Sequence, residues 1–91
     1  MTSNGTDSKD GITVYPTINM RTTGDRIRRM RIAAGLSVRE LSKMLCLSDV
    51  QAVYKWQRGE SLPSLDNLVL LSMIFHVPID DILALSYTEH Q

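Results

Sequence analysis

The stretch that decides the fold spans residues 37–59 and reads SVRELSKMLCLSDVQAVYKWQRG. It opens with Ser37 and Glu40, which have the Ser-x-x-Glu spacing of a capping box, where each side chain binds the other residue's backbone N–H. Leu41 and Leu45 follow four residues apart, so a helix places both on one side. The pattern therefore predicts a short helix that begins at Ser37.

The later half of the stretch predicts a second helix. Ser48 or Asp49 can cap its start, and Gly59 can adopt the positive φ that often follows a helix. On this helix Val53 and Trp56 fall on one side, which we assign to the core. The other side carries four longer side chains, those of Gln51, Tyr54, Lys55 and Arg58.

Further helices are expected on both sides of this stretch. Before it, Thr22 or Thr23 can cap a first helix. After it, apolar residues at helical spacing predict a fourth helix from Pro63 and a short fifth helix after Pro78. Five helices joined by short connections over residues 23–86 predict an all-α fold, a compact five-helix bundle in a single domain.

The two ends of the chain differ from this helical region. Residues 1–11 are almost entirely polar, which predicts a disordered tail. Residues 12–22 alternate between apolar and polar side chains over most of their length, so we expect an extended N-terminal arm. Pro16 lacks an N–H donor, which limits the arm to an edge strand or to lying on the bundle. Residues 87–91 are assigned to a C-terminal tail.

Charge is unevenly distributed along a chain whose formal net charge is zero. Residues 21–58 carry nine basic and three acidic side chains, whereas residues 59–91 carry five acidic side chains and no lysine or arginine. Because ionic fields are screened beyond about 8–10 Å, a locally basic surface attracts phosphate even on a neutral protein. The same arginines also fit the solvated side of a helix, so charge alone leaves both interpretations open.

Several classes of protein are disfavoured by the residues present. Cys46 is the sole cysteine, which leaves no partner for an intramolecular disulfide and no cysteine-rich zinc site. No apolar run approaches the ~18 residues of a membrane span, and the first residues lack a secretory signal. We therefore expect a cytoplasmic protein that does not associate with membranes.

The sequence also offers no set of catalytic residues. His76 lies in an apolar segment and His90 near the end of the chain. Asp80 and Asp81 fit the first turn of the last helix, where carboxylates interact favourably with the helix dipole. There is no glycine-rich phosphate loop and no metal-ligand spacing. We expect no enzymatic activity, no metal, no cofactor and no small-molecule sensing domain.

Three pieces of the sequence resemble a known family. They are LSVRELS at residues 36–42, AVYKWQRGESLPS at 52–64 and VPIDDIL at 77–83. In this order and at nearly this spacing, they are similar to the helix-turn-helix domains of phage Cro and CI repressors and bacterial Xre-type regulators. The resemblance implies a lambda-repressor-like bundle in a bacterial or phage-derived protein. It also implies sequence-specific binding to double-stranded DNA to regulate transcription, with repression favoured over activation.

The resemblance further implies a DNA-reading surface on the helix at about residues 49–58. Four base contacts and one phosphate contact are implied, at Val50, Gln51, Tyr54, Lys55 and Arg58. Chemistry agrees for Gln51, whose amide can pair with adenine, and for Lys55, which suits guanine acceptors or phosphate. For each of these residues the alternative is a solvated helix surface.

Further phosphate contacts are expected at the starts of the two helices, where backbone N–H groups and the helix dipole attract anions. Ser37 and Ser48 mark these starts. The family commonly has glutamine where this chain has Val38, so we expect Arg39 to take over that contact.

The turn between the two helices departs from the family pattern. Cys46 stands where the family often has glycine, and the turn is one residue longer than usual. Because a non-glycine residue at positive φ costs about 1 kcal/mol, we expect the extra residue to let Cys46 avoid that conformation. The register of the longer turn decides whether Val50 and Tyr54 face the DNA. Gln57 replaces a frequent glutamate, so it cannot form an ion pair with Arg31.

We expect a homodimer, because DNA reading by this motif generally pairs two half-sites about 34 Å apart. Four apolar residues exceed what one small core needs and could serve the interface, namely Leu70, Ile74, Leu83 and Leu85. The arm could pair as an edge strand in the dimer or cover its own bundle. The alternative function is a protein-interaction module or an antitoxin-like component with the same fold.

Overall fold

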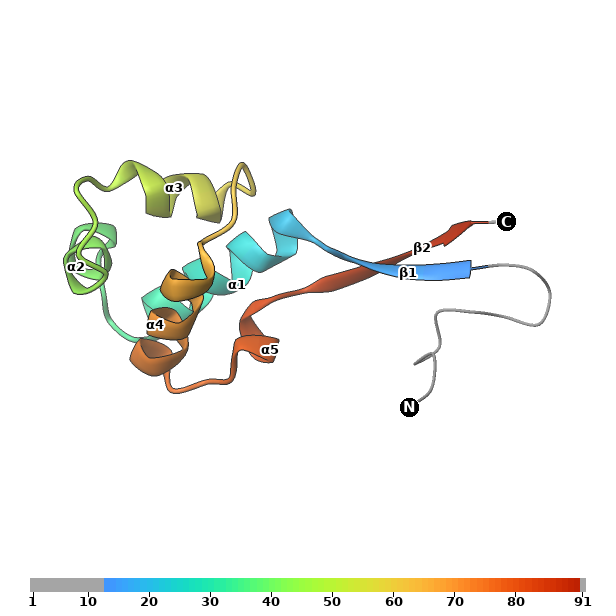
Figure 1. The fold of residues 1–91 in the computed structure, drawn as a ribbon. Helices are drawn as coiled ribbons and strands as arrows, with labels where there is room; N and C mark the ends of the chain where they lie inside the picture. Colours follow the sequence, from blue (N-terminus) through green and yellow to red (C-terminus); the bar gives the residue numbers. More distant parts are fainter. Residues whose placement is uncertain (1–12, 91) are drawn as a thin grey trace.

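The computed structural model describes residues 13–90, in which five helices are flanked by two strands (Figure 1). The elements in chain order are β1 (Thr13–Ile18), α1 (Met20–Ala33), α2 (Val38–Met44), α3 (Gln51–Gln57), α4 (Leu65–Phe75), α5 (Ile79–Ile82) and β2 (Leu85–His90). The tail expected at residues 1–11 lies outside the described residues. Within the described part of the chain, no helix has the length and apolar character needed to cross a bilayer.

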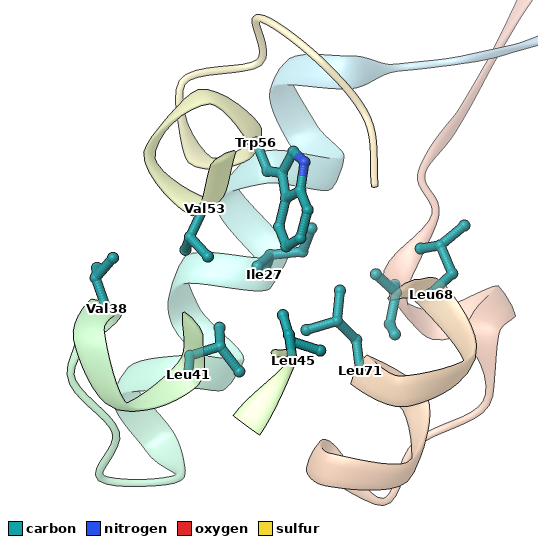
Figure 2. Close-up of a cluster of buried hydrophobic side chains, with 9 residues drawn as sticks. Ile27, Val38, Leu41, Leu45, Val53, Trp56, Leu68 and Leu71 are labelled. Atoms are coloured by element: carbon teal, nitrogen blue, oxygen red, sulfur yellow. The ribbon is translucent and has the colours of Figure 1, made fainter. Parts of the chain in front are cut away.

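One core holds the five helices together. Every helix contributes a fully buried apolar side chain to it, namely Ile27 from α1, Leu41 from α2, Val53 from α3, Leu71 from α4 and Ile82 from α5. These side chains converge with Trp56 and Leu45 at the centre of the bundle (Figure 2). The predicted five-helix bundle is confirmed, as is the assignment of Val53 and Trp56 to the core.

Helix α1 begins earlier than the sequence predicted. Its N-cap is Asn19, whose side-chain oxygen accepts a hydrogen bond from the Thr22 N–H at 2.9 Å. The expected caps Thr22 and Thr23 therefore lie inside the helix. Thr23 is fully buried, and its hydroxyl oxygen accepts a hydrogen bond from the Ala84 N–H at 2.9 Å. That long-range bond, rather than helix capping, is what Thr23 provides.

Gly24 brings α1 into close contact with the end of α3. A Cβ atom at this position would lie 2.0 Å from the backbone oxygen of Trp56 and 3.0 Å from that of Gln57. No side chain can be accommodated against two backbone carbonyl groups without moving one of the helices. The absence of a side chain at Gly24 therefore fixes how closely α3 lies against α1.

The two strands form an antiparallel ribbon that extends away from the bundle (Figure 1). The register runs from Thr13 opposite His90 to Ile18 opposite Leu85. At the base of the ribbon the Asn19 N–H donates to the Ala84 carbonyl oxygen at 2.8 Å, and the Asn19 side-chain amide donates to Ser86 Oγ at 3.0 Å. The start of α1 and the start of β2 are thus bound together.

This ribbon corrects three expectations. The fold is mainly helical rather than all-α, because residues 13–18 and 85–90 form a small sheet. Most of the segment expected as a C-terminal tail, residues 87–91, belongs to β2. The extended N-terminal arm expected over residues 12–22 is not confirmed, since residues 13–18 pair with β2 of the same chain and the last residues of the segment begin α1. The physical reason is that an extended backbone needs hydrogen-bond partners, and the other end of the chain supplies them.

Candidate nucleic-acid interface

Helix α2 is stabilised at its start by the predicted capping box. The Glu40 N–H donates to Ser37 Oγ at 3.0 Å, and the Ser37 N–H donates to Glu40 Oε1 at 2.8 Å. The hydrogen bond from the Ser37 N–H to the carboxylate holds the pKa of the Glu40 carboxyl below its usual value. The Ser37 N–H is thus occupied by a carboxylate of its own helix, whereas the Ser37 hydroxyl accepts the Glu40 N–H and keeps its own proton to donate.

The turn after α2 contains a left-handed residue. Cys46 has a φ of 56°, so the expectation that the longer turn would avoid positive φ is wrong. This conformation lets the Cys46 N–H reach the Lys43 oxygen at 3.0 Å and the Leu47 N–H reach the Ser42 oxygen at 2.9 Å. Both bonds satisfy carbonyl groups at the end of α2, which offsets the conformational cost of about 1 kcal/mol.

Residues 47–50 lead from the turn into α3. Helix α3 starts at Gln51, whose N–H donates to the Asp49 carboxylate at 2.8 Å. Asp49, the second of the two residues expected to cap this helix, therefore supplies the side-chain bond at its start. Val50 precedes the helix, is half-buried against the core and lines a hollow at the surface.

Three of the four residues assigned to base reading share the exposed side of α3. Gln51, Tyr54 and Lys55 are exposed, whereas Val53 and Trp56 on the opposite side are buried. Tyr54 is 39% exposed, so part of this residue is accessible from outside the bundle. The helix is therefore anchored on one side and open on the other.

Arg31 of α1 holds the end of α3 through hydrogen bonds. Its Nε donates to Gln57 Oε1 at 2.8 Å, and its Nη1 donates to the Leu36 carbonyl oxygen at 2.8 Å. The neutral Gln57 amide cannot form an ion pair with Arg31, but its oxygen accepts a hydrogen bond from the guanidinium. The Arg31 guanidinium thereby links three parts of the chain, which are α1, α3 and the segment that leads into α2.

Arg58 has an acidic partner that the sequence analysis did not identify. Its Nε lies 2.5 Å from Glu60 Oε2, and its Nη2 donates to Glu60 Oε1 at 3.3 Å, with both side chains about half exposed. The hydrogen bond from Arg58 holds the pKa of the Glu60 carboxyl below its usual value. A phosphate contact by Arg58 must therefore compete with this ion pair. The signal was present in the sequence, since Glu60 is only two residues away.

A hollow of about 230 Å³ lies where α2 meets the turn, and we call it the basic hollow because its lining holds two cations and one carboxylate. The charged residues are Arg39, Lys43 and Asp49, and the rest of the lining is Ser42, Leu47, Ser48 and Val50. Ser42 is buried, and its Oγ has no hydrogen-bond partner among the described residues. The structure thus brings Arg39 and Ser48 together and adds Lys43, which the sequence analysis did not assign to the site. The signal for Lys43 was its position four residues after Arg39, one helical turn along the same side.

A helix-turn-helix family model matches residues 27–82, so the chain belongs to the Xre/Cro/CI-type helix-turn-helix family of DNA-binding transcription regulators. No curated protein sequence matches the chain.

Solved structures share the fold. The restriction-modification controller protein C.AhdI from Aeromonas hydrophila is similar at a TM-score of 0.63 and 28% identity, over 70% of this chain and 96% of that one. The DNA-binding domain of BldD from S. venezulae gives a TM-score of 0.60 at 21% identity, over 71% of this chain and 96% of that one.

Proposed function

We propose that this protein reads a specific DNA sequence by inserting α3 into the major groove. The observation that carries the proposal is the two-sided character of α3, with Gln51, Tyr54 and Lys55 exposed and Val53 and Trp56 anchored in the core. The major groove is about 12 Å wide and admits one helix whose outward side chains reach base edges. An amide, a phenol and an ammonium group provide the donors and acceptors for that reading.

Phosphate contacts beside α3 would fix the register of the protein on the duplex. We assign them to Arg58 at the end of α3 and to the basic hollow lined by Arg39, Lys43 and Ser48. Arg39 and Lys43 in the hollow suit the phosphates that border the groove, and they outnumber the single carboxylate, that of Asp49, which accepts the Gln51 N–H. Ser37 supports this surface by capping the first turn of α2, and its N–H is bound to the Glu40 carboxylate.

We further propose that the protein acts as a homodimer in the cytoplasm of a bacterial or phage-infected cell. Two copies related by a twofold axis would present two α3 helices to half-sites about 34 Å apart. Repression is the proposed outcome. Occupying an operator is enough to exclude another protein from it, whereas activation requires an added productive contact.

Selection of bound sequences from a random duplex pool tests the proposal as a whole. We expect a palindromic consensus whose half-sites are separated by about one helical turn. Failure to bind random duplex even at low salt would contradict DNA binding, because non-specific attraction to phosphate is the minimum such a surface provides.

Replacing Gln51 with alanine is expected to relax base preference at one position in each half-site. A bidentate amide–adenine pair is worth about 1–3 kcal/mol of discrimination, and alanine cannot form it. Comparing the selected sequences of Q51A and wild type measures this loss. Asn67→Ala is the control, since Asn67 is a half-buried residue of the separate helix α4. An unchanged consensus in Q51A would show that α3 enters the groove in another register.

Replacing Arg58 with alanine is expected to reduce the slope of log affinity against log salt by about one, because one fewer counterion is released. Glu60→Gln is the matched variant. It removes the competing carboxylate while leaving Arg58 in place, so affinity should rise about two- to fivefold, as expected for loss of an exposed ion pair. Titrations at several salt concentrations measure both effects. Equal slopes for R58A and wild type would rule out the phosphate contact.

A further inference from the structure

A second hollow, of about 460 Å³, lies where the first turn of α1 meets the end of α3. Two arginines line it, Arg21 from α1 and Arg58 from the position that follows α3. The remaining lining residues are Thr22, Asp25 and Gln57. We call this the arginine hollow. It lies at the opposite end of α3 from the basic hollow, whose lining residues all precede that helix.

Two glycines let the segments that carry these arginines approach each other. A Cβ atom on Gly59 would lie 2.9 Å from the Arg21 Cα, so the turn after α3 lies directly against the first turn of α1 (Figure 1). Gly24, three residues further along α1, lies against the Trp56 carbonyl oxygen in the same way. The backbone positions of Arg21 and Arg58 are therefore fixed relative to each other.

Arg21 is exposed and has no carboxylate partner. In the part of the chain that the structure describes, ion pairs join Arg29 to Asp25 at 2.9 Å and Arg58 to Glu60, and neither includes Arg21. The one carboxylate in the lining, that of Asp25, is thus already bound by Arg29. An incoming anion can bind Arg21 without displacing another group.

Neutral donors complete the lining of the arginine hollow. The Oε1 atom of Gln57 accepts from Arg31 Nε at 2.8 Å, which leaves the Gln57 NH₂ group without a partner among the described residues. Thr22 adds an exposed hydroxyl. A phosphodiester is negatively charged and only accepts hydrogen bonds, so it matches two guanidinium groups, an amide NH₂ and a hydroxyl.

We propose that the arginine hollow holds one phosphate of the DNA backbone between the Arg21 and Arg58 side chains, and that both are needed to hold it. Arg21 attracts this phosphate first, because Arg58 must leave Glu60 before it can bind. This inference rests on the DNA reading proposed above. It adds to it a binding residue from α1, which the first turn of that helix presents beside the end of α3.

The position of the arginine hollow favours a backbone phosphate over a soluble one. Helix α3 runs between the two hollows, and its seven residues span about 10 Å. The phosphates of the two strands border a major groove about 12 Å wide. Phosphate sites at both ends of a helix of this length match the borders of the groove and would fix the angle at which α3 enters it. A soluble phosphate requires no such placement.

Affinity for duplex DNA at several salt concentrations tests the pairing of the two arginines. R21A should bind about tenfold more weakly than wild type and reduce the slope of log affinity against log salt by about one, as R58A does. R21A/R58A should lose no more than either single variant, because the phosphate that needs both contacts is already lost. R21K should keep the wild-type slope, since it keeps the charge. R21A should also unfold at the wild-type urea concentration, because Arg21 is exposed.

Two results of these titrations would overturn the proposal. One is a wild-type slope in R21A, and the other is a slope reduced by about two in R21A/R58A, which would mean two separate phosphates. Neither result bears on DNA reading by α3, which the base preference of Q51A tests independently.

Methylphosphonate substitution tests the same contact with the unaltered protein. Making one phosphate of the duplex neutral at a time should reveal a position that weakens wild-type binding about tenfold but leaves the binding of R21A and R58A unchanged. R39A, altered at the other end of α3, should remain sensitive at that position. Loss of sensitivity at different phosphates in R21A and R58A would contradict the shared site.

Titration with inorganic phosphate distinguishes a backbone phosphate from a soluble one. The backbone amide resonances of Thr22 and Gln57 in labelled wild-type protein should shift on addition of duplex DNA, and should show no saturation with millimolar inorganic phosphate at constant ionic strength. Saturation by inorganic phosphate, together with unchanged DNA binding by R21A, would assign the hollow to a soluble anion and overturn the proposal.

Discussion

Replacing Gly24 with alanine is expected to lower the free energy of unfolding by about 3 kcal/mol or more. The new Cβ would lie 2.0 Å from the Trp56 carbonyl oxygen, a distance that no rotamer change can relieve because the backbone of α1 fixes the Cβ position and the oxygen belongs to the backbone of α3. Overpacking in a well-packed core costs about 1–3 kcal/mol when side chains can adjust, and here the helices themselves must move. Small domains have about 5–15 kcal/mol of stability, so G24A would lose a large share of it.

Urea unfolding followed by the fluorescence of Trp56, the sole tryptophan, measures this effect. Gly35→Ala is the matched control, since a Cβ there meets no atom within 4 Å. G35A should cost only about 1 kcal/mol, because Gly35 has a φ of 73° and alanine is strained in that region. Similar stabilities for G24A and G35A would mean that α1 and α3 are not held as closely as described.

Trp56→Ala is expected to destabilise the fold by about 3–5 kcal/mol, the usual range for removing a buried large aromatic side chain. Trp56 is 4% exposed and packs in the centre of the core beside Ile27 (Figure 2). Without it, α3 would lose its principal anchor, so DNA binding should fall together with stability. Thermal unfolding followed by circular dichroism measures the change, since the fluorescent residue itself is removed.

Tyr54→Ala is the control for this prediction. Tyr54 lies on the same helix two residues earlier, on the exposed side, so its removal should change stability by no more than about 0.5 kcal/mol. Y54A should instead weaken specific DNA binding in a folded protein. A W56A protein as stable as Y54A would contradict the assignment of Trp56 to the core.

Local patterns were sufficient to predict the helices and the inward side of α3. The capping box of Ser37 and Glu40 depends on residues three apart, and both of its hydrogen bonds are present. The spacing of Val53 and Trp56 likewise placed both in the core. These features depend on neighbouring residues, whose geometry a helix fixes in advance.

Features that depend on distant residues were not predicted. Strand β2 pairs with a strand some seventy residues earlier, and its short alternation at the end of the helical region gave too weak a signal on its own. The positive φ of Cys46 was missed for a different reason: its hydrogen bonds are local, but the turn is selected by the Ser42 and Lys43 carbonyl groups it must satisfy rather than by the preference of cysteine. In the candidate site, sequence reasoning placed Gln51, Tyr54 and Lys55 on one side but overlooked the ion pair of Arg58.

The separation of the two sides of α3 also bears on how proteins of this kind diverge. Val53 and Trp56 hold the helix in the bundle, while Gln51, Tyr54 and Lys55 make no contribution to the buried core. Mutations at the three outward positions can therefore accumulate without threatening folding. A duplicated copy of the gene could acquire a new operator through a few such substitutions, with the inherited scaffold left intact.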